Sequence, residues 1–89
     1  MNLFQQQFVD FFELPEEVIT DVPLLMLAGS KKIFLENHKG IATYQQDIIK
    51  VRINNGFLII EGKKLQIKEI AKENLLIFGL ILKLSFDLV

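Results

Sequence analysis

The chain has 89 residues, of which ten are basic, eleven are acidic and none is cysteine, and its formal net charge is −1. This length fits a single domain, residues 1–89, near the lower limit for an independent core. The missing cysteines exclude disulfides and thiolate metal sites, and the near-neutral charge argues against nucleic-acid binding, so neither a cofactor nor a nucleic-acid partner is expected.

The beginning of the chain is predicted to be a helix, residues 1–14, followed by a connector, residues 15–23. Pro15 ends the helical pattern because the residue before a proline avoids helical geometry. Phenylalanines recur there at the spacing of one helical face, namely Phe4, Phe8, Phe11 and Phe12.

Residues 24–89 form the β region, because the apolar period changes from 3.6 to 2 at its start. Asn54-Asn55-Gly56 is the strongest hairpin signal, and Glu61-Gly62-Lys63 indicates another turn. Gly79, followed by further apolar residues, indicates a bulge or a sharp bend. We expect a mainly β fold, either a small antiparallel roll or a two-layer sandwich with one N-terminal amphipathic helix. Its seven or eight short strands are expected near 24–28, 32–36, 41–45, 48–54, 57–61, 64–70, 74–78 and 80–87.

The alternation assigns most apolar side chains to one inward face, namely Leu25, Leu27, Ile33, Leu35, Ile49, Val51, Ile53, Leu58, Ile60, Leu65, Ile67, Leu75 and Ile77. Several large apolar side chains fall on the opposite face. These outward residues and the helix phenylalanines form a candidate apolar interface, namely Phe4, Phe8, Phe11, Phe34, Phe57, Ile59, Leu76 and Phe78. Either the N-terminal helix covers the outward residues, or a second subunit does.

His38 is the single histidine, and it raises the question of catalysis or metal binding. A metal site needs three or four ligands, and only Glu36 is near in sequence. Neither Ser30 nor Ser85 has the context of a catalytic nucleophile. A turn in which Asn37 bonds its own backbone and Gly40 takes a positive φ fits the residues better, so the chain is not expected to be an enzyme.

Basic residues on the outward face suggest a second function, binding of a small ligand or of nucleic acid along a phosphate backbone. The five candidates are Lys32, Lys50, Arg52, Lys64 and Lys68.

The run Ile33-Phe34-Leu35-Glu36-Asn37-His38-Lys39-Gly40-Ile41, with Leu27-x-Gly29 before it and Tyr44 after it, resembles the YabP/YqfC family of sporulation proteins. The later glycine-ended units at 58–62 and 75–79 fit the same pattern, and Leu14-Pro15 resembles the YqfC branch. The resemblance implies a small protein made in the mother cell during endospore formation, with no catalytic residues. By analogy, the candidate turn and partner-binding positions are Glu36, Asn37, His38, Lys39, Gly40 and Tyr44.

The combined prediction is a non-enzymatic sporulation protein that acts through protein–protein contacts. Its expected partners are further copies of itself, a membrane-associated sporulation protein, or both. Residues 1–15 lack the features of a signal peptide, and the apolar run from Leu75 to Leu82 is too short to span a bilayer. We therefore expect a cytoplasmic protein that reaches a membrane only through a partner.

Overall fold

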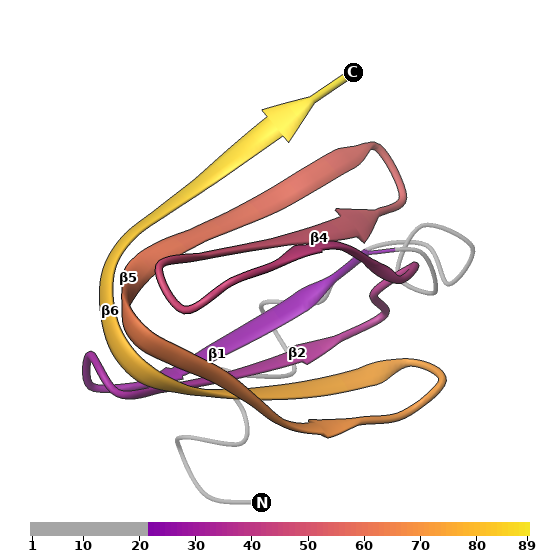
Figure 1. Cartoon of the computed structure of the whole chain (residues 1–89). Helices are drawn as coiled ribbons and strands as arrows, with labels where there is room; N and C mark the ends of the chain where they lie inside the picture. Colours follow the sequence, from indigo (N-terminus) through magenta and orange to yellow (C-terminus); the bar gives the residue numbers. More distant parts are fainter. Residues whose placement is uncertain (1–21) are drawn as a thin grey trace, which may run out of the picture.

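The computed structural model describes residues 22–89, and Figure 1 shows that they form β-strands joined by short turns. The six strands of this region pair antiparallel in one open sheet, in the order β1-β2-β6-β5-β4-β3. Their bounds are β1 (Leu24–Ala28), β2 (Lys32–Glu36), β3 (Ile41–Tyr44), β4 (Ile48–Ile53), β5 (Gly56–Ile70) and β6 (Asn74–Leu88).

The prediction of an antiparallel all-β fold is confirmed for these residues, but the predicted number of strands is wrong. Expected strands 57–61 and 64–70 are one strand, β5, and expected strands 74–78 and 80–87 are one strand, β6. The predicted turn at Glu61-Gly62-Lys63 is therefore a bend inside β5. The predicted N-terminal helix lies outside the described residues.

The two long strands bend, and the sheet folds over on itself. A straight strand of 15 residues would be about 50 Å long, whereas the longest dimension of the domain is 38 Å. Figure 1 shows β5 and β6 curving together on one side of the molecule. We call the segments before and after the bend the first limb (56–61 of β5, 74–78 of β6) and the second limb (65–70 of β5, 82–88 of β6).

The bend results from β-bulges in the pairing of β5 with β6 and from a close backbone contact at Gly79. The pairing register of β5 and β6 shifts between Glu61 and Gly62 and again between Lys63 and Gln66, which is the mark of β-bulges. Gly79 has a φ of +143°, in the region that favours glycine. A Cβ atom at Gly79 would lie 2.8 Å from the carbonyl oxygen of Lys64, so the strands meet at a distance that only glycine permits.

Two hairpin turns hold the bend from opposite sides. The β3–β4 turn accepts hydrogen bonds from β5, since Gly62 N–H donates to the Asp47 carbonyl at 3.0 Å and Leu65 N–H to that of Gln46 at 2.8 Å. The β1–β2 turn does the same for β6, with Gly79 and Ile81 donating to Lys31 and Ser30 at 3.1 and 2.8 Å. These four N–H groups, at the bend of β5 and β6, thus find acceptors in the turn carbonyls. N–H groups shielded from water rarely remain without such a partner.

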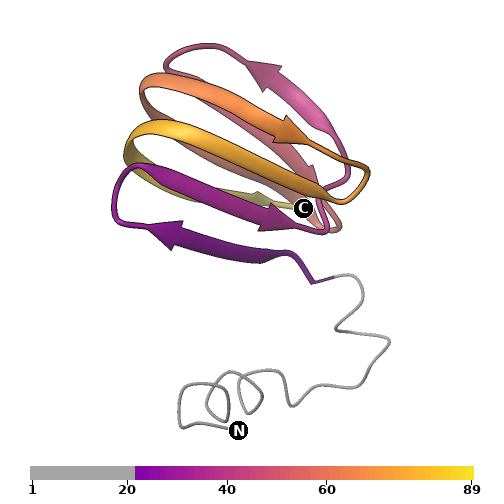
Figure 2. The same ribbon diagram turned by 90° about the horizontal axis from the view of Figure 1, so that it is seen from below.

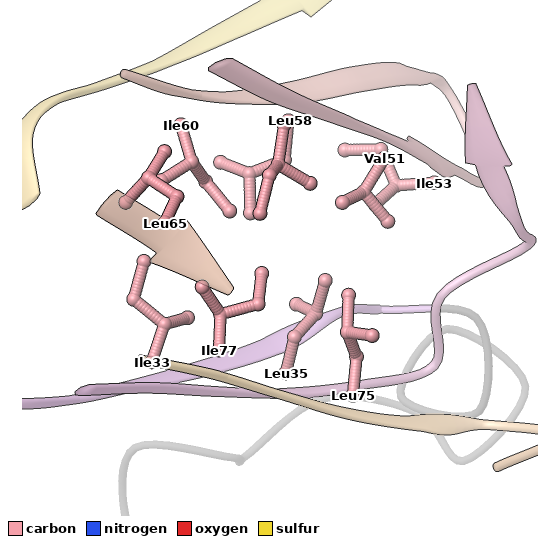
Figure 3. Packing of buried hydrophobic residues seen from close by; sticks show 10 residues of the cluster. Ile33, Leu35, Val51, Ile53, Leu58, Ile60, Leu65, Leu75 and Ile77 are labelled. Atoms are coloured by element: carbon pink, nitrogen blue, oxygen red, sulfur yellow. The ribbon is translucent and has the colours of Figure 1, made fainter. Parts of the chain in front are cut away.

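Folding places two halves of the sheet face to face. Figure 2 shows one half from below, with β1, β2, the first limb of β6 and the second limb of β5 side by side. The other half contains β3, β4 and the remaining limbs. Figure 3 shows their facing rows of side chains, Ile33, Leu35, Leu75 and Ile77 against Val51, Ile53, Leu58 and Ile60. These eight side chains, together with Ile49 and Leu65, are buried and form the core.

Candidate interaction surfaces

The connection between β2 and β3, residues 37–40, is held by its own backbone geometry. Asn37 has a φ of +67° and Gly40 a φ of +120°, two positions where asparagine and glycine are tolerated better than other residues. The predicted positive φ at Gly40 is therefore confirmed. The Asn37 side chain, however, donates from Nδ2 to the Val22 carbonyl at 2.8 Å, and not to its own backbone as predicted.

His38 lies inside this connection and is 6% exposed. Its Nε2 lies 2.9 Å from the Ala71 carbonyl oxygen, and Gly40 N–H donates to its Nδ1 at 3.1 Å. A neutral ring with its proton on Nε2 satisfies both contacts, because one nitrogen then donates and the other accepts. His38 thereby joins the β2–β3 connection to the β5–β6 turn.

Further backbone bonds attach residues 37–40 to two neighbouring elements. Asn37 N–H donates to the Glu73 carbonyl at 2.8 Å, and Lys39 N–H donates to that of Arg52 at 2.7 Å. Arg52 N–H donates in return to the Gly40 carbonyl at 2.8 Å. The segment is therefore a structural joint. Of its predicted interaction residues, Lys39 is exposed, while Glu36 is half-buried opposite Asn74 of β6.

Tyr44 lies at the end of edge strand β3, and its side chain reaches the second limb of β5. Ile67 N–H donates to the Tyr44 hydroxyl oxygen at 2.9 Å, on the side of β5 where Leu65 N–H donates to Gln46. The residue is 51% exposed, so Tyr44 combines a structural bond with an accessible surface.

We expect the Tyr44→Phe variant to lose about 0.5–1 kcal/mol of unfolding free energy, because the Ile67 N–H loses its acceptor at a partly hydrated site. Urea denaturation measures the loss. Hydrogen exchange should quicken at the Ile67 amide and stay unchanged at Ile60, on the other limb of β5. Unchanged exchange at Ile67 would show that this bond is not formed in solution.

The outward apolar residues predicted from the sequence occupy two separate faces. Phe34, Leu76 and Phe78 lie on the half that contains β2, where Phe34 pairs with both Met26 and Leu76. We call Met26, Phe34 and Leu76, neighbours across three strands, the apolar row. Two hollows of about 300 and 370 Å³ adjoin this row.

The second group, Phe57 and Ile59, lies on the outer face of the other half, next to Arg52 and Lys50 of β4. The predicted phenylalanines of residues 1–14 lie outside the described residues. The five outward residues of the β region are therefore not one surface.

Lysine side chains partly cover the aromatic rings on both faces. The Lys50 Nζ lies 4.3 Å from the centre of the Phe57 ring. Around Phe78, Lys32 and Lys68 lie 5.0 and 5.7 Å from the ring centre. Cations at these distances are attracted to the ring face, and their aliphatic stems shield apolar surface. The apolar row has no such cover among the described residues.

Comparison with known proteins identifies the chain. The family model described as "YabP family" matches residues 21–88, which include all six strands of the structure. The chain belongs to the YabP family. It is 33% identical over 69 residues to the Bacillus subtilis (strain 168) protein described as "Uncharacterized protein YqfC". These aligned residues cover 78% of this chain and 74% of the relative. No solved structure matches the chain. The resemblance predicted from the sequence is confirmed, and YabP is a sporulation-related family that is not known for enzymes.

The described part of this YabP-family protein presents no group of three or more His, Cys, Asp or Glu side chains arranged for a metal ion. No helix among residues 22–89 is long and apolar enough to cross a membrane.

Sequence reasoning missed one exposed apolar segment, the second limb of β6. Phe86 and Leu88 of this limb are 55% and 56% exposed. The alternation of Leu82, Leu84, Phe86 and Leu88 indicated a strand, but the strand order was needed to show that it has an open edge.

Proposed function

We propose that this YabP-family protein is a non-enzymatic component of endospore formation that acts through protein–protein contacts. It associates with further copies of itself, and the assembly docks on a membrane-associated partner of the same programme. The observation that carries the proposal is the apolar row, where Met26 is 46% exposed and Phe34 and Leu76 are half-buried on an outer sheet face.

Physical chemistry supports a contact role for this row. Outer faces of antiparallel sheets are usually polar when they face water, and an apolar patch bordered by polar residues is typical of interaction sites. Here Lys32 and Glu69 border the row, so the face combines an apolar centre with a charged margin.

The proposal is tested by replacing the native gene in an endospore-forming host. A deletion strain should form fewer heat-resistant spores, and the wild-type gene should restore the yield. The Met26→Lys gene should not restore it, because a charge would lie within the contact face. Gln45→Lys is the matched control, since Gln45 is exposed beside Tyr44, away from the row.

Two results would contradict the proposal. Wild-type spore yield in the deletion strain would rule out an essential role in sporulation. Full restoration by the Met26→Lys gene would rule out the apolar row as the contact surface. Circular dichroism of the purified variants separates loss of contact from loss of folding.

A second candidate function, binding of a polyanion, rests on a different observation. Lysines 31, 32, 63 and 64 line a hollow of about 610 Å³ that also contains Phe78. Cations around an aromatic ring are typical of single-strand binding sites. Of the five basic residues predicted for this role, Lys32, Lys64 and Lys68 lie near Phe78, while Lys50 and Arg52 lie on the other face. Binding of labelled single-stranded oligonucleotides that weakens steeply with salt would support it.

A further inference from the structure

The second limb of β6 is an open sheet edge. On one side its residues 83–88 pair with the first limb of β5. β2 pairs only with residues 74–78 of β6, and the β1–β2 turn reaches no further than Ile81. Along residues 82–88, the other side of the strand therefore has no backbone partner among the described residues. Figure 1 shows this limb at the margin of the sheet.

The remaining open edges of the described sheet carry features that oppose strand pairing. β1 and β3 have only five and four residues, and β3 contains a register shift. The second limb of β5 follows Lys64, which has a φ of +53°, and contains a register shift between Ile67 and Glu69. Short strands, bulges and lysines are the usual protections of an edge. The β6 limb has no register shift along 83–88, and its two charged residues, Lys83 and Asp87, have opposite signs.

The hydrogen-bonding direction of the limb is fixed by its last contact. Val89 N–H donates to the Asn55 carbonyl at 2.9 Å, toward β5. Because these directions alternate along a strand, the backbone groups of Leu84, Phe86 and Leu88 point toward the open edge. A second strand can therefore form hydrogen-bonded pairs only at these even-numbered residues.

We propose that a second copy of this chain binds this edge, its β6 limb antiparallel to the first, with a two-fold axis at Ser85. This register places Leu84 opposite Phe86 of the second copy and Lys83 opposite Asp87 of the second copy. The inference deepens the proposed function and rests on it, because it names the surface through which the protein associates with itself.

Charge complementarity selects this register over its neighbours. Residues opposite each other must share a face, so the axis passes through a residue, and the registers next to Ser85 have it at Leu84 or at Phe86. An axis at Leu84 places Lys83 opposite Ser85, and an axis at Phe86 places Asp87 opposite Ser85. Only the axis at Ser85 forms two Lys83–Asp87 pairs, and opposite charges directly across a strand pair are stabilising.

The other face of the limb supplies matching apolar side chains. Leu84 and Phe86 lie across from the inward residues Ile60 and Leu58, so they share the core face of the sheet. The Phe86 side chain is 55% exposed and the Leu88 side chain 56% exposed in the single chain. Pairing at Ser85 brings Leu84, Phe86 and Leu88 of both copies onto one continuous face, where they are removed from water.

A single cysteine tests the register, because the full chain has no cysteine of its own. Residues on the axis form a non-hydrogen-bonded pair, with Cα atoms about 4.5 Å apart, a separation that a disulfide can bridge. The Ser85→Cys variant should therefore form a disulfide-linked dimer under mild oxidation. The matched control is Lys83→Cys, whose two copies would lie about 13 Å apart along the strands, so it should remain unlinked.

Charge reversal tests the same pairs without a covalent bond. Asp87→Lys places lysine opposite Lys83 of the second copy at two points. Sedimentation should then show a dimer dissociation constant raised roughly tenfold or more. The double variant Lys83→Asp/Asp87→Lys restores opposite charges and should recover most of the affinity. In the monomer of the double variant, the exposed Lys83–Glu61 pair, 3.9 Å long, is replaced by two facing carboxylates, whose effect is small at this exposure.

The results distinguish a wrong register of the β6 pairing from a failure of the protein to associate with itself. If the wild-type chain forms dimers while the Ser85→Cys variant stays unlinked and Asp87→Lys leaves the affinity unchanged, the β6 register is wrong and self-association stands. If sedimentation finds only single chains at high concentration, this inference fails together with the self-association on which it rests. Cross-linking of Lys83→Cys as readily as of Ser85→Cys would also overturn the register.

Discussion

Replacing Gly62 with alanine is expected to lower the free energy of unfolding by about 3 kcal/mol. A Cβ atom at this position would collide with the carbonyl oxygen of Leu80 and come within 3.2 Å of Leu65 Cδ2. The first contact is with backbone, which cannot turn away as a side chain can. The bend of β5 would have to open, and the two halves of the sheet would no longer pack tightly. Urea denaturation measures the loss.

Gly29→Ala is the matched control for this prediction. Gly29 has a φ of +56°, but a Cβ atom there would meet no other atom within 4 Å. Its cost is the backbone conformation alone, about 1 kcal/mol. Equal losses for the two variants would show that the approach of β5 to β6 at Gly62 does not limit stability.

The second large effect is expected for His38→Ala, which should lower the free energy of unfolding by about 2–3 kcal/mol. The change empties a buried site and leaves the Gly40 N–H and the Ala71 carbonyl without their partner. Polar groups that lose their partner at a partly buried site pay part of their desolvation cost. Urea denaturation gives the free energy, and hydrogen exchange at Gly40 reports the local contact.

Two conservative variants separate the contacts of His38. In His38→Asn the amide oxygen can take the place of Nδ1 and accept from Gly40, and in His38→Gln the amide nitrogen can take the place of Nε2 and donate to Ala71. Each should recover part of the loss. A His38→Ala variant as stable as the wild type would show that the joint between residues 37–40 and the β5–β6 turn carries no stability.

Most of the core could be predicted from alternation alone, because one buried face imposes a period of two on each strand. The inward residues expected from the sequence include all ten buried core residues, for example Ile33, Val51 and Ile77. Leu27 was also expected inward, but it is 52% exposed because β1 is an edge strand. The hairpin at Asn54-Asn55 is confirmed, since β4 ends at Ile53 and β5 begins at Gly56.

The bend could not be predicted because its local signal is ambiguous. Gly62 between two alternating runs fits a turn as well as a bulge inside one strand. What decides is the pairing with Leu80 and Ile81, which lie far along the chain. The prediction for Gly79 was better, since apolar residues follow it directly, and it lies inside β6 as a bend requires.

The candidate site was predicted in part. A structural role for His38 followed from the lack of nearby ligands, but its bond to Ala71, 33 residues away, has no local signal. Alternation predicted that Phe34 and Phe57 point outward, and strand order was needed to place them on different faces. Four of the five neighbouring strand pairs are consecutive in the chain, but the pairing of β2 with β6, which places Phe34 beside Leu76, has no local signal.

The most direct test of self-association is the solution mass of the full chain, measured by light scattering over a range of concentrations. A single chain has a mass of 10.3 kDa. We expect a mass that rises with concentration to at least that of a dimer, because residues 22–89 leave the apolar row and the β6 edge uncovered. A mass that stays at 10.3 kDa at every concentration would contradict association of the protein with itself.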